Sequence, residues 1–144
     1  RLETNPPELA GLHFGLSGDP LDITVGLTTT GDHEIHLAIG DAINNLGPCE
    51  IRIYDDTTLM ETIAISSPGA ANSFRDATNA VYTAANWVAN EAPVTVTFST
   101  TIMRVVAAVS GGSFGYLCHI AYEATGGGGG PVAYFRRQLL LGVG

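Results

Sequence analysis

A repeated alternation of apolar and polar residues constrains the fold of this chain more than any other feature. Val94, Val96 and Phe98 alternate with threonines. Because successive side chains of a strand point to opposite faces, a period of two predicts a strand with one buried face. The same pattern recurs between turn residues from position 21 to position 123. The other inward rows that it predicts are Ile23, Val25 and Leu27; Ile35, Leu37 and Ile39; Cys49, Ile51 and Ile53; Met103, Val105, Ala107 and Val109; and Tyr116, Cys118, Ile120 and Tyr122.

These rows predict about seven or eight short strands separated by turns, and no long amphipathic helix. Such spacing is typical of an all-β fold, an antiparallel β-sandwich or jelly roll. We therefore expect one β-sandwich domain over residues 21–125. The 144 residues are enough for one domain with its own core, and the low charged content of 14% with 18 glycines suits strands and tight turns. Residues 70–92 are ambiguous, and within them Thr78–Ala89 could hold one helical turn or an irregular strand.

Both ends of the chain have the composition of extended arms. Pro6 and Pro7 block helix within residues 1–20. Five consecutive glycines at 126–130 form a linker with little conformational preference, so residues 126–144 are expected to be a glycine linker followed by a docking segment. Aromatic and arginine side chains are enriched at interface centres, and such a segment can add a strand to a neighbour's sheet. The residues expected at an assembly interface are Pro6, Pro7, Tyr134, Phe135, Arg136, Arg137, Leu139, Leu140 and Leu141. The alternative is that residues 132–141 fold back as the last strand of the same domain.

The charge balance limits the class of partner. The net charge is −8, and the six basic residues are all arginine. An acidic chain without a basic stripe is repelled by phosphate backbones and by anionic membranes. No apolar run approaches the roughly 20 residues that a membrane-spanning helix needs. We therefore expect self-association or other particle subunits as partners, glycans as the alternative, and neither nucleic acid nor a membrane span.

Three aromatic residues form the candidate ligand site. Trp87, Tyr82 and Tyr54 could present a platform for a sugar ring, with Asn86, Asn90 and Asp55 near enough to bind hydroxyls. The alternative is that Trp87 anchors the core, because aromatic side chains dominate core energetics. The aspartates near loops, Asp55 among them, are otherwise expected to cap turns rather than to bind Ca²⁺.

The two cysteines allow two interpretations. Cys49 and Cys118 both fall on predicted inward rows. A disulfide between them would join the two sheets and would contribute about 4 kcal/mol by the loop-entropy estimate. The alternative is two buried, unreactive thiols.

Neither catalysis nor metal binding has a convincing sequence signal. Ser113 lies between glycines at the spacing of a nucleophile elbow, but the elbow needs a helix after the serine and here a strand is predicted. A hairpin turn is the better interpretation. His33 and His36 fall on opposite faces of one strand and are expected to face solvent at its end. We expect no enzyme activity, no metal site and no cofactor.

The segment that closes the predicted sandwich resembles a known group of folds. It runs from Trp87 to Glu123 and includes VTVTFSTTIMRVVAAVSGGSFGYLCHIAYE. It is similar to the closing strands of galactose-binding-like jelly rolls, which occur in carbohydrate-binding modules and in phage head-decoration, fibre and tail proteins. The resemblance implies a β-sandwich that binds glycans or packs onto a particle, and it carries over no site residue. The expected function is a structural protein of a virion surface, or else a carbohydrate-binding module of a secreted protein, located in the virion or outside the cell.

Overall fold

The computed structural model describes residues 12–14, 20–41, 49–66, 73–83, 92–109, 115–125 and 133–135, and in these residues the chain is built from strands. The strands are β1 (Leu12–Phe14), β2 (Leu21–Gly26), β3 (Gly31–Asp41), β4 (Cys49–Asp55), β5 (Thr58–Ile65), β6 (Ser73–Arg75), β7 (Val81–Thr83), β8 (Val94–Phe98), β9 (Ile102–Val109), β10 (Gly115–Ala124) and β11 (Ala133–Phe135). Nowhere in these ranges is there a helix long and apolar enough to cross a membrane.

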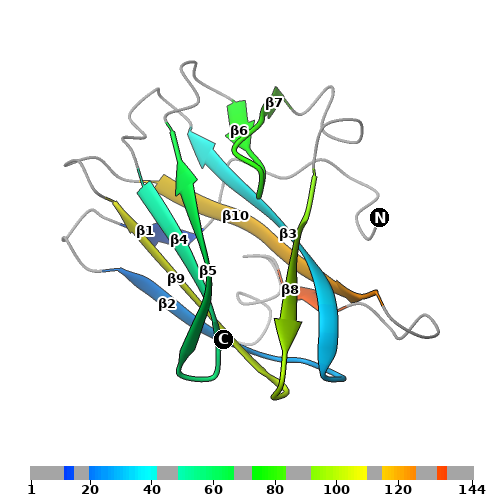
Figure 1. Cartoon of the computed structure of the whole chain (residues 1–144). Coiled ribbons are helices and arrows are strands. Elements are labelled where there is room, and N and C mark those ends of the chain that lie inside the picture. The colour runs from blue at the N-terminus through cyan, green and yellow to red at the C-terminus, as the bar shows by residue number, and fades with distance from the viewer. Residues whose placement is uncertain are drawn as a thin grey trace.

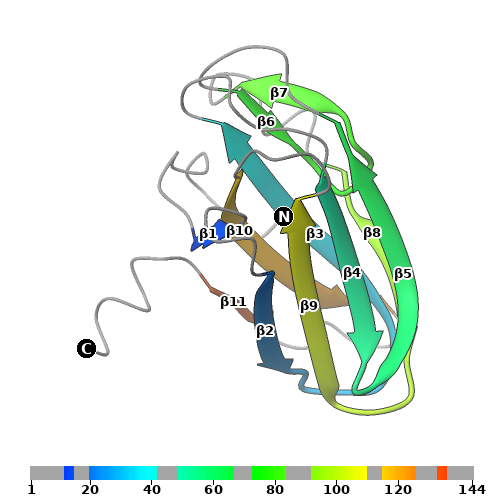
Figure 2. The same ribbon diagram turned by 90° about the vertical axis from the view of Figure 1, so that its left-hand side faces the viewer.

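The strands form two antiparallel sheets that lie face to face (Figures 1 and 2). The smaller sheet has the order β2-β9-β4-β5. The larger sheet has the order β1-β10-β3-β6-β7, with β11 also paired to β10 and β8 also paired to β3. The predicted all-β sandwich is therefore confirmed, and the inward rows expected from the alternation correspond to β2, β3, β4, β8, β9 and β10.

The order of pairing is nested along the chain. β4 pairs with β5, β3 with β8, β2 with β9 and β1 with β10, so the second half of the chain retraces the first. Each nested pair lies in the opposite sheet from the next pair. This is the order of a jelly roll, a long antiparallel hairpin rolled into two sheets. The short β6 and β7 are inserted between β5 and β8.

The core lies between the two sheets and is built from the predicted rows. Apolar side chains of β4 and β8 alternate with more exposed ones because each strand turns one face inward, whereas in β3 and β9 the neighbours Ala38 and Val106 are buried as well. The residues of this core that are fully or almost fully buried include Ile35, Leu37, Ile39, Cys49, Ile51, Ile53, Val96, Phe98, Met103, Val105, Ala107, Ile120 and Tyr122. Burial of these side chains is the main force that holds the two sheets together.

One predicted row is interrupted by a shift of register. Along β10 the partners in β3 pass from Leu117–Ile39 directly to His119–Ala38, which skips Cys118. An extra residue of this kind is a β-bulge, and it changes which residues of a strand share a face. The predicted row of Tyr116, Cys118, Ile120 and Tyr122 therefore does not run unbroken along β10. The expectation failed because a period of two in the sequence does not reveal an inserted residue.

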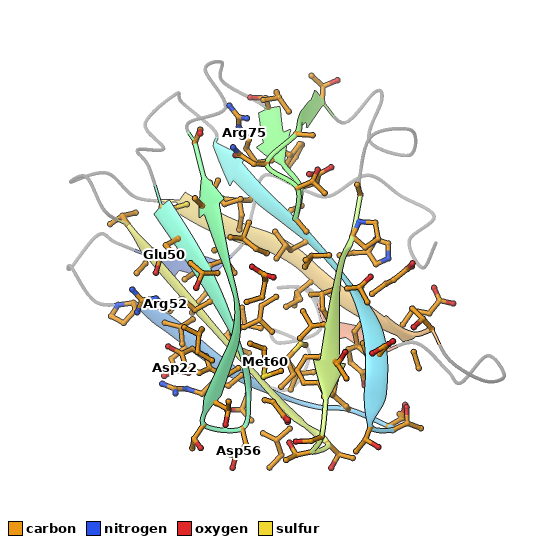
Figure 3. The ribbon with its side chains drawn as sticks, in the orientation of Figure 1. Asp22, Glu50, Arg52, Asp56, Met60 and Arg75 are labelled. Atoms are coloured by element: carbon orange, nitrogen blue, oxygen red, sulfur yellow. The ribbon has the colours of Figure 1, made fainter. Side chains whose placement is uncertain are left out.

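The ambiguous region contains a small hairpin at the edge of the larger sheet. Residues 73–83 form β6 and β7, which are antiparallel, and β6 pairs with the end of β3. Figure 3 shows Arg75 here, at the opposite end of the molecule from Asp56 in the β4–β5 turn. In the described part of 78–89, which ends at Thr83, the strand interpretation is correct because β7 lies there, and residues 84–89 lie outside the described residues.

The larger sheet extends into both segments predicted as arms. β1 lies within 1–20 and β11 lies within 126–144, and both pair with β10 of the same chain. The sandwich therefore includes strands beyond the predicted limits of 21–125. The arms are not wholly separate from the domain.

Candidate functional site

The edge of β10 is the place where the two ends of the chain come together. β3 occupies one edge of β10 from Tyr116 to Ala124. On the other edge, β1 lies opposite residues 115–117 and β11 lies opposite residues 120–122. β1 and β11 therefore follow each other along one edge, although more than a hundred residues separate them in the sequence. Figure 2 shows both short strands beside β10.

Two of the predicted interface residues lie in this pairing. Phe135 is opposite Ile120, and Tyr134 is opposite Ala121. For β11, the structure therefore has the second of the two alternatives, in which residues 132–141 fold back onto their own domain. Pro6, Pro7, Arg136, Arg137, Leu139, Leu140 and Leu141 lie outside the described residues. Their role at an interface remains a prediction.

The three aromatic residues of the predicted sugar platform are not gathered on one sheet. Tyr54 lies in β4 of the smaller sheet, and Tyr82 lies in β7 of the larger sheet, opposite Phe74. The tip of the β4–β5 hairpin, near Tyr54, and β7 are at opposite ends of the sandwich (Figure 1). Trp87 lies outside the described residues. The two tyrosines are therefore carried by strands of different sheets, and the sugar platform stays a prediction.

The outer face of the smaller sheet carries an ordered polar cluster that sequence reasoning missed. Arg104 donates from Nε to Oδ1 of Asp22 at 2.8 Å and from Nη2 to Oδ2 at 2.6 Å. Its guanidinium carbon lies 5.1 Å from the centre of the Tyr54 ring. The hydrogen bond from Arg104 lowers the pKa of Asp22 below its usual value. The three residues come from the adjacent strands β2, β9 and β4, so only the tertiary pairing brings them together.

A second ion pair lies on the same face. Arg52 donates from Nε to Glu50, two positions before it on β4, and both side chains are partly exposed. Figure 3 shows Asp22, Glu50 and Arg52 over the smaller sheet. Exposed pairs of this kind contribute little to stability, so we interpret them as keeping this face polar and solvated.

Asp55 fixes a crossover between the sheets. It is the last residue of β4 and is only 5% exposed. Its carboxylate accepts hydrogen bonds from the backbone N–H of Ser99 (2.8 Å) and Thr100 (3.0 Å) and from both of their hydroxyls. The hydroxyls of Ser99 and Thr100 are the main cause that lowers the pKa of Asp55 to about 2. Residues 99–101 lead from β8 in the larger sheet to β9 in the smaller one.

The predicted turn-capping role of Asp55 is therefore confirmed. Four donors from the crossover already engage the carboxylate, so its suggested role toward sugar hydroxyls does not hold. Neighbouring backbone bonds strengthen this end of the sandwich: Leu27 donates from its N–H to the carbonyl of Thr101, and Asp56 donates to that of Ile102.

Asp76 organises the opposite end of the sandwich. It is fully buried and accepts hydrogen bonds from the backbone N–H groups of Thr78, Ala80 and Ala92 and from the Thr78 hydroxyl. These contacts shape the β6–β7 turn and tie it to the residues that precede β8. An aspartate followed two positions later by threonine is a signal for such a side-chain turn, and it was present in the sequence. The hydrogen bond between Asp76 and Ala92 could not be predicted from the sequence.

His33 contradicts its predicted solvent exposure. Its side chain is fully buried, with ring centres 5.5 Å from Phe98 and 5.8 Å from Tyr122. Its Nδ1 lies 3.0 Å from the carbonyl oxygen of Gly31, so Nδ1 carries the proton. Position 33 continues the inward row of Ile35, and a short extrapolation of the alternation would have found it. His36, three positions on, lies near Glu34, with 3.9 Å between Nε2 and Oε2. In the described ranges, no three histidine, cysteine, aspartate or glutamate side chains gather as a metal site.

The cysteine prediction is left partly open. Cys49 is buried at the start of β4, and burial raises the pKa of its thiol to about 12. Cys118 belongs to β10 of the larger sheet, and its side chain lies outside the described residues. The two cysteines are thus in opposite sheets, as a bridge between sheets would need, and the bond itself stays a prediction.

Ser113 lies outside the described residues, but the strands before and after it are described. β9 ends at Val109 in the smaller sheet, and β10 begins at Gly115 in the larger one. The segment between them joins two sheets, so it is not the hairpin loop that the sequence suggested. A strand does follow Ser113, as predicted, in place of the helix of a nucleophile elbow.

Comparison with protein-family models, with curated proteins and with solved structures finds no match.

Proposed function

We propose that this protein is a non-enzymatic structural subunit of a virion, a phage surface or decoration component. In this proposal the jelly roll is the body, and the two terminal arms contact neighbouring subunits. The observation that carries it is the end-to-end placement of β1 and β11 on one edge of β10. Each arm supplies a strand of only three residues to the same backbone edge. Because both terminal segments add short strands to the same edge of β10, that edge is suited to pairing with a strand from another copy.

Composition supports the same function. A net charge of −8 without lysine argues against packing on nucleic acid, which favours protein subunits as partners.

The fold alone does not decide between functions, because jelly rolls serve as capsid proteins, as lectins and as cupins. The carboxylates described above, Asp55 and Asp76, are engaged by backbone and hydroxyl donors that shape turns. We assign them a structural role.

The test is the oligomeric state of the full chain and of a shortened chain. We expect the full chain to form a defined oligomer in light scattering and a regular particle or ring in electron microscopy. Removal of residues 126–144 should leave a folded sandwich, with unchanged far-ultraviolet circular dichroism, that no longer assembles. The core residues of β3, β4 and β9 are all retained in that variant. A full chain that is monomeric at all concentrations, or a shortened chain that assembles normally, would reject the proposal.

A carbohydrate-binding module is the second candidate. The observation that favours it is Tyr54, an aromatic residue flanked by Arg104 and Asp22 on the outer face of the smaller sheet. A sugar ring could stack on such a residue, with the charged groups binding hydroxyls. In this case the chain should be a monomer that binds glycans, and Tyr54→Ala should abolish binding. The stacking of Arg104 on the ring competes with a sugar, which is why we place assembly first.

A further inference from the structure

The connection between β10 and β11 is longer than their pairing requires. β10 ends at Ala124 and β11 begins at Ala133, so eight residues join two adjacent antiparallel strands. Two residues are enough for a hairpin between such neighbours. If the ladder continued from Tyr122–Ala133 until residue 124 lay opposite residue 131, a two-residue turn would then keep the same register with four residues fewer. Five of the connecting residues are glycines, which neither favour a tight turn at one place nor stiffen the chain.

The length of the connection is enough for β11 to extend beyond its own subunit. Eight residues in extended conformation span at most about 26–29 Å. That distance is enough to carry β11 past the edge of its own sheet, since neighbouring strands lie only about 4.8 Å apart. The connection is therefore compatible with two placements of β11, one on its own β10 and one on the β10 of an adjacent copy.

Both placements offer the same backbone bonds. β11 pairs with β10 through three consecutive positions, Ile120 with Phe135, Ala121 with Tyr134, and Tyr122 with Ala133. Because the main chain forms the ladder, an identical strand from a second copy can replace it without any new chemistry. Exchange of an identical element between copies is a low-cost route to association.

We propose that β11 is exchanged between subunits, so that in the assembly β11 of one copy pairs with β10 of the next copy in the register seen here. This inference rests on the proposed assembly function and identifies the surface through which two copies would contact each other. That surface is the part of the β10 edge that lies beyond β1 and pairs with β11 in this structure. The partner is a second copy of this chain. β1 remains on its own β10 and covers residues 115–117 of that edge.

The first experiment places cysteines at one opposed pair. Ala121→Cys and Tyr134→Cys are introduced into one chain in which Cys49 and Cys118 are changed to alanine. Directly opposed antiparallel residues have Cα separations of about 4.5–5.5 Å, within the range for a disulfide. The assembled protein is oxidised, denatured and run on a non-reducing gel. Exchange predicts covalent dimers and a ladder of larger species. A matched control, Thr95→Cys with Tyr134→Cys, places one cysteine on β8 and should give neither.

The outcomes separate the two proposals. Cross-linked dimers and larger species from assembled protein support exchange. Assembled protein that yields only internally bridged monomers overturns exchange and leaves the assembly function standing. Protein that is monomeric before oxidation overturns the assembly function, and exchange with it.

A second variant keeps the test decisive if the cysteine variant does not fold. Deletion of Gly126–Gly129 leaves four residues between Ala124 and Ala133, which is short enough to hold β11 on its own β10. Exchange predicts a folded monomer in light scattering. Normal assembly of the deletion variant would overturn exchange. The matched control replaces the same four glycines by Ser-Gly-Ser-Gly, which retains length and flexibility and should assemble as the unchanged chain does.

Discussion

The carboxylate of Asp55 accepts hydrogen bonds from both the backbone N–H and the hydroxyl of Ser99, which lies 44 positions further along the chain. Asp55 ends β4 in the smaller sheet, and Ser99 follows β8 in the larger sheet. One side chain therefore fixes the place where the chain passes from one layer of the sandwich to the other. The geometry of the crossover depends on that carboxylate being ionised, because the ionised form is a pure hydrogen-bond acceptor.

The pH dependence of stability should show this contact. The pKa of Asp55 is lowered to about 2 in the folded chain, and an unfolded aspartate has a pKa of about 3.9. A lowered pKa means that the ionised form stabilises the fold. This contribution is complete above about pH 4 and is lost as the pH falls toward 2. We expect Asp55→Asn to lower the melting temperature at pH 7 by several degrees, and the difference from the unchanged chain to shrink between pH 4 and pH 2.

The control for this measurement is Asp56→Asn. Asp56 is the exposed neighbour in the β4–β5 turn and has a φ of 55°, which asparagine tolerates well. We expect its melting temperature to stay close to that of the unchanged chain at every pH. An equal loss of stability in both variants, or a difference for Asp55→Asn that does not change with pH, would contradict the role assigned to Asp55.

Gly31 should be far less tolerant of alanine than Gly26. Gly31 has a φ of 100°, a conformation that side chains with a Cβ rarely adopt, and Gly26 has no such value. A Cβ added at either position meets no atom within 4 Å, so the two substitutions differ only in backbone strain. We expect Gly31→Ala to lower the free energy of unfolding by about 1–2 kcal/mol. Gly26→Ala should change it by less than about 1 kcal/mol. Urea denaturation of both variants measures the difference, and equal effects would contradict the assigned strain.

Ile51 is the position where we expect a large loss from truncation. Its side chain is fully buried in β4, between β5 and β9. Ile51→Ala removes buried methyl groups and leaves a cavity, so the free energy of unfolding should fall by about 2–5 kcal/mol. Ile102→Ala is the matched control, because Ile102 is 41% exposed and its truncation should cost within about 0.5 kcal/mol. Chemical denaturation compares the two, and a similar cost for both would mean that Ile51 is not in the core.

The thiol of Cys49 should be unreactive in the folded protein. Burial raises its pKa to about 12, and the thiolate is the reactive form. We expect no alkylation of Cys49 by iodoacetamide at pH 8 in native buffer, and complete alkylation in denaturant without reductant. Peptide mass spectrometry measures both. If alkylation in denaturant required a reductant, Cys49 would be bridged, and the disulfide with Cys118 that the sequence left open would be the first pair to examine.

The alternation of apolar and polar residues predicted most of the sandwich. The inward rows of Ile35, Ile51 and Met103 were readable because burial of one strand face is a local property with a period of two. The bulge at Cys118 was not readable, since an extra residue changes the phase without changing the composition. The burial of His33 was missed because a polar residue at the end of a row was assigned to solvent. The cluster of Asp22, Arg104 and Tyr54 needed three strands to become neighbours first.

The sequence by itself determined that this protein has a β-sandwich body with a buried face on each main strand, because that information is carried by neighbouring residues. Only the tertiary structure decided which strands are neighbours, and with them the nested jelly-roll order. It also decided that Asp55 accepts hydrogen bonds from Ser99 and that β1 and β11 both pair with β10. The physical reason is that strand pairing uses backbone groups that every residue has. Partners are therefore selected by the packing of the whole sandwich and not by a local signal.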